Sequence, residues 1–139
     1  MRLTIIIILL SLAFIACHTT KPIPKGDAET AKISEAESDS TEYELIVMDV
    51  RFDSFLATQP LKEFYSNEYY RNWNIQYVTE WNIRHSNPLR YGDFYQTQID
   101  YSPHIDYGIK LNYQLYNYFL FIEKEYGIVL IRRGKTASY

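Results

Sequence analysis

The sequence predicts a small α+β domain over residues 42–133, in which two or three short strands pack with two long amphipathic helices. Three observations support this fold class. Two short runs rich in β-branched residues lie near the ends of the segment, apolar residues at helical spacing lie between them, and aromatic residues are abundant throughout. Of the 139 residues, 14 are Tyr, 7 are Phe and 2 are Trp. Tyrosine rings commonly pack on one side and hydrogen-bond on the other.

The first strand is predicted over about 43–50 and the second over about 128–133. They contain the runs ELIVMDV and IVLIR, which are nearly continuously apolar and have no helical spacing. Such runs are typical of strands that are covered on both faces. Gly127 comes just before the second run, at a position where a glycine commonly ends a helix.

A third strand is predicted over about 94–101. In its segment YQTQIDY the side chains alternate, with Tyr95, Thr97, Ile99 and Tyr101 on one side of the chain. Alternation with a period of two residues is typical of a strand with one buried face and one exposed face.

Two helices are predicted between the strands, over about 66–86 and 109–126. Ser66 is a suitable N-cap for the first helix, and the Asn87-Pro88 pair limits its length. The second helix carries one apolar stripe at helical spacing, formed by Leu111, Leu115, Tyr118, Phe119, Ile122 and Tyr126. Phe121 projects away from this stripe, so either another part of the fold covers it or it belongs to a contact surface.

Residues 1–16 are predicted to be the signal peptide of a lipoprotein. Arg2 is followed by an apolar run from Ile5 to Ala16, shorter than the roughly 20 residues that a helix needs to cross a bilayer. A charged start, a short apolar stretch and a small residue before the cleavage point are typical of export signals. Cys17 comes next and is the only cysteine, so it has no partner for an internal disulfide.

The segment FIAC, which ends at Cys17, resembles a lipobox. In bacterial lipoproteins this motif marks the cysteine that receives diacylglycerol and becomes the mature N-terminus. Phe14 departs from the usual leucine, and the alternatives are a simple signal with a cysteine nearby or an uncleaved anchor. Attached acyl chains, palmitate among them, would hold the protein on a membrane, since each buried CH₂ contributes about 0.8 kcal/mol.

Residues 17–41 are predicted to be the lipidated cysteine followed by a disordered tether, and residues 134–139 a flexible tail. Ile23 and Ile33 are the only large apolar residues of the tether. Such a segment cannot bury enough apolar area to offset the entropy lost on ordering. The tether would therefore hold the folded domain away from the lipid surface.

The folded part resembles a family of small lipoproteins of unknown function from the Bacteroidota. The resemblance covers Tyr43 to about Ile131 and is carried by YELIVMDVRFDSFLATQP, FYSNEYYRNWNIQYVTEWNIR, NPLRYGDFYQTQIDY and IDYGIKLNYQLYNYF. It implies a location in the cell envelope and brings no functional residues with it. In that group a lysine with an acidic cluster after the cysteine accompanies export to the surface. Here Lys21 is followed by Pro22, and the first acid is Asp27, which favours the periplasmic side of the outer membrane.

The candidate binding residues lie on one face of the first helix. At about 100° per residue, an arc of roughly 120° holds Tyr69, Trp73, Tyr77, Glu80, Trp81 and Arg84. Glu80 and Arg84 have the spacing and order of a helical ion pair, but charges are costly within a buried stripe. Two alternatives remain. The pair bonds to tyrosine hydroxyls and loop backbone at the edge of the core, or rings and charges form an aromatic-walled site for a sugar or a partner's side chains.

The segment between the helices, residues 88–107, gathers several charged residues among its tyrosines, namely Arg90, Asp93, Asp100, His104 and Asp106. Hard cations bind several oxygen ligands, but these aspartates do not have EF-hand spacing, and turn formation explains them better. We therefore predict no metal and no cofactor.

No catalytic residues are predicted. The chain lacks a G-x-S-x-G elbow, an H-E-x-x-H motif and a glycine-rich phosphate loop. Lipidation would block the thiol of Cys17, so it could not act as a nucleophile. The spacing of the carboxylates does not single out any pair for general acid–base catalysis. We therefore expect that this protein is not an enzyme.

The predicted function is that of an accessory lipoprotein, anchored to the envelope by its N-terminal lipid, that binds another envelope protein. A carbohydrate- or peptidoglycan-binding module is the alternative, and a small hydrolase is a third possibility. The formal net charge is −3, and cleavage would also remove Arg2. Because nucleic-acid binding depends on Lys and Arg neutralising phosphates, this charge argues against a nucleic-acid partner.

Overall fold

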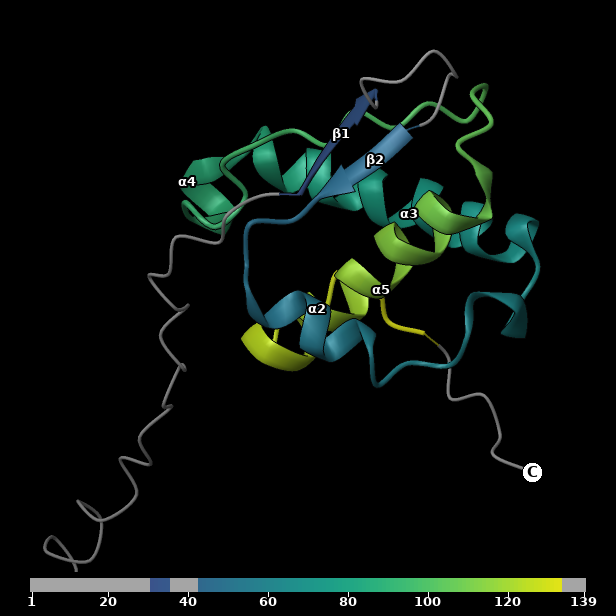
Figure 1. Ribbon diagram of the computed structural model, residues 1–139. Helices are drawn as coiled ribbons and strands as arrows, with labels where there is room; N and C mark the ends of the chain where they lie inside the picture. The colour runs from purple at the N-terminus through teal and green to yellow at the C-terminus, as the bar shows by residue number, and fades with distance from the viewer. Residues whose placement is uncertain (1–30, 36–42, 134–139) are drawn as a thin grey trace, which may run out of the picture.

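The computed structural model describes residues 31–35 and 43–133, which form a small α+β domain and confirm the predicted fold class (Figure 1). The predicted signal peptide, Cys17 and the tail lie outside these residues. The elements in chain order are β1 (Lys32–Glu35), β2 (Tyr43–Ile46), α2 (Arg51–Leu56), the 3₁₀ helix η2 (Lys62–Phe64), α3 (Asn67–His85), α4 (Pro88–Tyr91) and α5 (Gly108–Tyr126). The largest interface joins α3 and α5, while β2 and α2 also pack on α5. Among the described residues, no helix combines the length and apolar character needed to cross a membrane.

The two long helices agree with the sequence prediction to within a residue or two. Ser66 caps α3, because its Oγ accepts a hydrogen bond from the Tyr69 backbone N at 3.2 Å. At the C-terminal end of α5, Gly127 adopts a φ of 66°, and its N–H donates to the Glu123 carbonyl. This left-handed conformation is the one that a glycine adopts without cost, so Gly127 ends the helix as expected.

The sheet is an antiparallel hairpin of β1 and β2, in which Ile33 lies opposite Leu45. The predicted tether had placed Lys32–Glu35 outside the domain, and this boundary is corrected: Ala31 and Leu45 are buried, and Ile33 packs against the core. The four residues of β1 carry one large apolar side chain, so local pattern could not reveal the strand. Pairing with β2 stabilises it.

The first predicted strand, 43–50, is shorter than expected because β2 ends at Ile46 and α2 begins at Arg51. Helix α2 was not predicted. Its Phe52 and Phe55 rings lie with their centroids 5.6 and 5.5 Å from that of Phe121. Phe121 is fully buried. It is therefore covered by another element of the fold, α2, and does not form an exposed contact surface.

The strand predicted over 94–101 is absent, although Ile99 and other apolar residues of this segment are buried as expected. Its carbonyl groups accept hydrogen bonds from side chains of α3 instead of from a neighbouring strand. Trp81 Nε1 donates to the Thr97 carbonyl and Asn82 Nδ2 to the Ile99 carbonyl, each at 2.9 Å, and Asn82 Oδ1 accepts from the Ile99 N–H at 3.0 Å. Because these side chains satisfy the backbone, the segment packs on α3 without joining a sheet.

The strand predicted over 128–133 is also absent from the structure. Leu130 is buried, which agrees with the apolar character of the run. However, Arg84 Nη2 donates to the carbonyls of Val129 and Leu130 at 3.1 and 3.2 Å. The arginine therefore provides hydrogen bonds that a second strand would otherwise supply, and the segment is irregular, with a bend at Leu130 and Ile131.

Asp49 joins the start of α2 to the end of α5. Its carboxylate accepts hydrogen bonds from Arg51 Nε and Nη2 at 3.0 and 2.7 Å and from the Tyr126 hydroxyl at 2.7 Å. The bonds from Arg51 are the largest cause of a pKa of Asp49 that lies well below its ordinary value. The ionised carboxylate is therefore favoured in the folded state.

We expect Asp49→Asn to lower the free energy of unfolding by about 1 kcal/mol at pH 7, since charge-assisted hydrogen bonds are lost at a partly exposed site. Because the folded-state pKa is depressed, the stabilisation is present above the ordinary pKa of 3.8 and is lost as the pH falls through the folded-state value. Urea unfolding of both proteins from pH 7 down to pH 2 measures this. A difference that stayed the same across that range would contradict the assignment.

Candidate functional site

The predicted face of α3 divides into a buried group and a half-buried group. Trp81 and Tyr77 are 0 % and 1 % exposed, whereas Tyr69 and Trp73 are half-buried. The Tyr77 ring stacks on Phe119 with a centroid separation of 4.8 Å. A ligand could therefore reach the half-buried rings but not the faces of Tyr77 and Trp81.

Glu80 and Arg84 form the ion pair that their spacing predicted, with Arg84 Nε donating to Glu80 Oε1 at 2.7 Å. The remaining nitrogens of Arg84 donate to the Tyr95 hydroxyl at 2.8 Å and to the two carbonyls of the 128–133 segment. Burial alone would lower the pKa of Arg84, but the hydrogen bonds to Glu80 and Tyr95 raise it. Of the two arrangements considered for this pair, the structure has the one in which Arg84 donates to a tyrosine hydroxyl and to loop carbonyls at the edge of the core.

Arg133, which sequence reasoning placed at the end of a strand, is enclosed by aromatic rings. Its Nε donates to the Tyr77 hydroxyl at 2.7 Å and its Nη1 to the Tyr116 hydroxyl at 2.8 Å. The guanidinium carbon lies 5.1 Å from the ring centroids of both Trp73 and Tyr116, which is cation–π distance. No sequence signal pointed to this cage, because its members come from α3, α5 and the C-terminal segment.

The cage leaves the charge of Arg133 without a carboxylate. Within the described residues, Arg133 forms no ion pair, and its Nη2 is buried without a hydrogen-bond partner. A buried donor without an acceptor is costly. Within the described residues, the positive charge of Arg133 is therefore balanced by tyrosine hydroxyls and aromatic rings, and not by a carboxylate.

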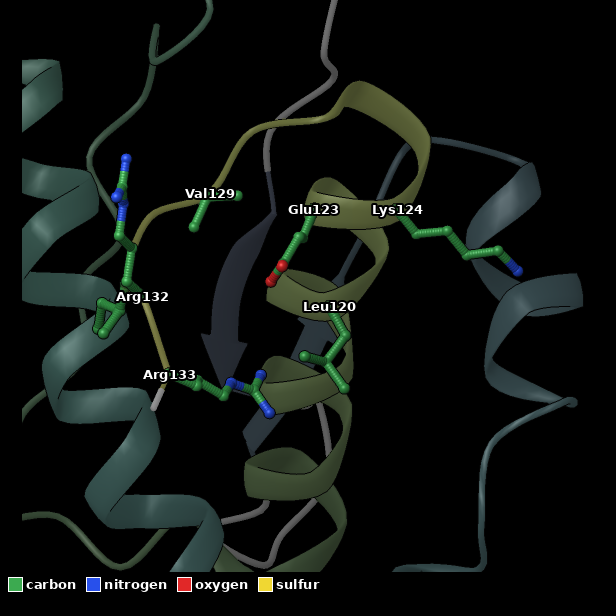
Figure 2. A pocket seen from close by; sticks show the side chains of 7 residues that line it. Leu120, Glu123, Lys124, Val129, Arg132 and Arg133 are labelled. Atoms are coloured by element: carbon green, nitrogen blue, oxygen red, sulfur yellow. The ribbon is translucent and has the colours of Figure 1, made fainter. Parts of the chain in front are cut away.

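A hollow of about 750 Å³ lies beside Arg133, between α5 and the 128–133 segment (Figure 2). We call it the basic cleft. It is lined by Leu120, Glu123, Lys124, Val129, Ile131, Arg132 and Arg133. In Figure 2 the side chains of Glu123 and Arg133 point into the hollow, whereas that of Lys124 extends away from it toward α2 and that of Arg132 lies on the other side of the 128–133 segment. Three cations and one acid give the lining an excess of positive charge.

A second hollow, of about 190 Å³, lies further toward the start of α5, and we call it the tyrosine cleft. It is lined by Gln59, Pro60, Tyr65, Tyr70, Tyr113, Tyr116, Asn117 and Leu120. Burial raises the pKa values of Tyr70 and Tyr113, so both hydroxyls are neutral hydrogen-bonding groups. The cleft combines flat apolar walls with hydroxyl and amide groups.

Exposed apolar residues lie next to the tyrosine cleft. Leu61 and Phe64 are 79 % and 64 % exposed, and Phe64 contacts the ring of the cleft residue Tyr65 with centroids 4.7 Å apart. Large apolar side chains that gather at the rim of a cleft commonly mark a binding surface. Sequence analysis did not single out this segment.

The charged residues predicted between the helices do not come together as a site. Arg90, Asp93, Asp100, His104 and Asp106 are all exposed, and Asp106 Oδ1 accepts a hydrogen bond from the Gly108 N–H at 3.0 Å, as a turn-forming aspartate would. Within residues 31–35 and 43–133, no group of three or more His, Cys, Asp or Glu side chains is placed to hold a metal ion. A third hollow, of about 320 Å³, is lined by His85, Pro88, Gly92, Asp93, Tyr95 and Gln96.

Comparison with known proteins places nearly the whole chain in one family. Residues 3–137 match DUF6146, which is described as a family of unknown function. No curated protein and no solved structure matches the chain. Function must therefore be argued from the site itself.

Proposed function

We propose that this chain, which belongs to the DUF6146 family of unknown function, is a non-enzymatic lipoprotein that binds another protein of the cell envelope. In this proposal the chain is exported, lipidated at Cys17 and anchored to the outer membrane, with the domain on the periplasmic side. The support for export and lipidation is the charged start, the short apolar run and the FIAC motif of the sequence.

The observation that carries the binding proposal is the exposed apolar surface of Leu61 and Phe64 beside the tyrosine cleft. Protein interfaces are enriched in aromatic residues and arginine, and a few well-packed anchors contribute most of the binding energy. Here exposed Leu61 and Phe64, a cleft walled by tyrosines and a half-buried Trp73 occur on the described surface. These residues offer apolar anchors and a cleft in which a partner's side chain can bind.

A carbohydrate or peptidoglycan ligand is the second candidate, and one observation favours it. The tyrosine cleft places the amides of Gln59 and Asn117 among flat rings, a combination that suits a sugar ring. Its volume of about 190 Å³ is below the range of about 300–1,000 Å³ that is usual for small-ligand pockets. This size favours the insertion of a single side chain, and therefore the protein partner.

The proposal is tested by in-cell chemical crosslinking of the tagged, lipidated full-length chain, followed by detergent extraction and mass spectrometry. We expect one recurrent envelope protein, whose recovery falls at least about tenfold in Leu61→Ser/Phe64→Ser, as loss of central apolar anchors predicts. Leu89→Ser is the matched control, because Leu89 is equally apolar and fully exposed on α4. Cys17→Ser should abolish anchoring and lower the yield.

Two results would overturn the proposal. If wild-type crosslinks contain no protein above background, the accessory function is wrong. If glycan-linked peptides are recovered from the wild type but not from Tyr113→Ala, which removes a ring of the tyrosine cleft, the second candidate replaces it. Recovery that falls equally in Leu89→Ser would show that the apolar surface near Leu61 is not specific.

A further inference from the structure

The two clefts lie along the same helix, α5, and share one lining residue, Leu120. We call the surface that runs from one cleft to the other the α5 track. Tyr113, Asn117, Leu120 and Lys124 follow one another at spacings of three or four residues, which places them on one face of the helix. From Tyr113 to Lys124 the helix rises by roughly 16 Å. That length matches roughly five residues of an extended chain, which rises about 3.3 Å per residue.

The two ends of this track differ in chemistry. The tyrosine cleft presents rings, hydroxyls and amides and no charged side chain. The basic cleft is lined by three cations, Lys124, Arg132 and Arg133, and by one acid, Glu123. Lys124 Nζ lies 5.2 Å from the centroid of the Phe55 ring. This excess of positive charge is local, because Asp and Glu outnumber Lys and Arg by 17 to 14 in the whole chain. The track therefore selects an apolar group at one end and an anion at the other.

We propose that the α5 track binds an extended segment of the envelope partner, with an apolar or aromatic side chain in the tyrosine cleft and an Asp or Glu side chain in the basic cleft beside Arg133. The inference rests on the proposed function and specifies its binding mode. Within the described residues Arg133 forms no ion pair, so the partner's carboxylate acts as its counterion from the open side of the cleft. Leu120, Val129 and Ile131 contact the apolar part of the segment between these two anchors.

Other occupants fit the track less well. Residues 134–139 follow Arg133 in the sequence, but this stretch, GKTASY, contains a lysine and no Asp or Glu. An anionic bilayer would meet Arg132, yet a flat surface cannot enter a hollow between α5 and the C-terminal segment. Charge and shape together favour an acidic segment of another protein.

The test places a photo-crosslinking residue at position 120 in the full-length lipidated chain, with the same residue at exposed position 76 on α3 as the control. We expect light-dependent adducts from position 120 alone, mapping to an acidic and apolar stretch of the partner. Arg132→Glu should reduce the adduct at least about tenfold, because attraction becomes repulsion. Arg90→Glu makes the same charge change at an exposed residue of α4 and should leave the yield unchanged.

The outcomes separate this inference from the broader function. If chemical crosslinking recovers a partner while position 120 forms no adduct with it, the track is not the binding mode, and the accessory function stands. Adducts to residues 134–139 of the same chain, or to lipid, would overturn the inference by naming another occupant. An adduct yield that is unchanged in Arg132→Glu would show that no Asp or Glu of the partner binds in the basic cleft. Failure to recover any protein would reject both.

Discussion

Trp81→Ala is expected to lower the free energy of unfolding by about 4–5 kcal/mol, the upper part of the range for a large aromatic residue in a core. The side chain is 0 % exposed, and its removal leaves a cavity beside Tyr95, whose ring centroid lies 4.9 Å away. It also removes the donor to the Thr97 carbonyl. Chemical denaturation of the purified protein, followed by circular dichroism, measures the change.

Two variants make this result interpretable. Trp81→Phe keeps most of the apolar volume and removes the N–H donor, so it should cost about 1–3 kcal/mol. Trp73→Ala should cost less than Trp81→Ala, because Trp73 is only half-buried. If Trp81→Ala were nearly neutral for stability but abolished partner recovery, Trp81 would be a binding residue, and its place in the core would not explain its role.

Phe121→Ala is expected to lower the free energy of unfolding by about 3–5 kcal/mol. Phe121 is the fully buried ring that joins α5 to Phe52 and Phe55 of α2. Because α2 has only six residues, it depends on this contact and not on its own helical propensity. Hydrogen exchange should therefore show loss of protection at 51–56 before any change in the centre of α3.

Leu120→Ala is the matched control for Phe121→Ala, since Leu120 is the next residue of the same helix and is only partly buried. We expect it to cost less stability and to leave the exchange of α2 unchanged. Equal protection of α2 in the wild type and in Phe121→Ala would show that the aromatic contact does not hold α2 on the domain.

The binding surface was only partly accessible to sequence reasoning. Helical projection correctly brought Glu80 and Arg84 together, because a pair four residues apart on a helix is a local feature. The same projection could not tell which rings of the stripe are covered. Trp81 is buried by the segment around Tyr95, whereas Trp73 is left half-buried beside Arg133, and both contacts depend on parts of the chain distant in sequence.

The sequence by itself determined the α+β class, the two long helices and their ends. These follow from local physics: a serine cap at Ser66, a left-handed glycine at Gly127 and apolar residues at a period of 3.6. It also indicated that the segments 94–101 and 128–133 contribute to the core, as Ile99 and Leu130 do, although Val129 is exposed.

Only the tertiary structure decided how the backbone of those two segments is satisfied. Their apolar patterns predicted strands, but Trp81, Asn82 and Arg84 of α3 supply the donors that a neighbouring strand would have supplied. In the same way, β1 exists because β2 pairs with it, and α2 because Phe121 accepts its rings. Hydrogen bonds and contacts between residues far apart in sequence leave no period in the chain, and the two clefts along α5 arise from such contacts.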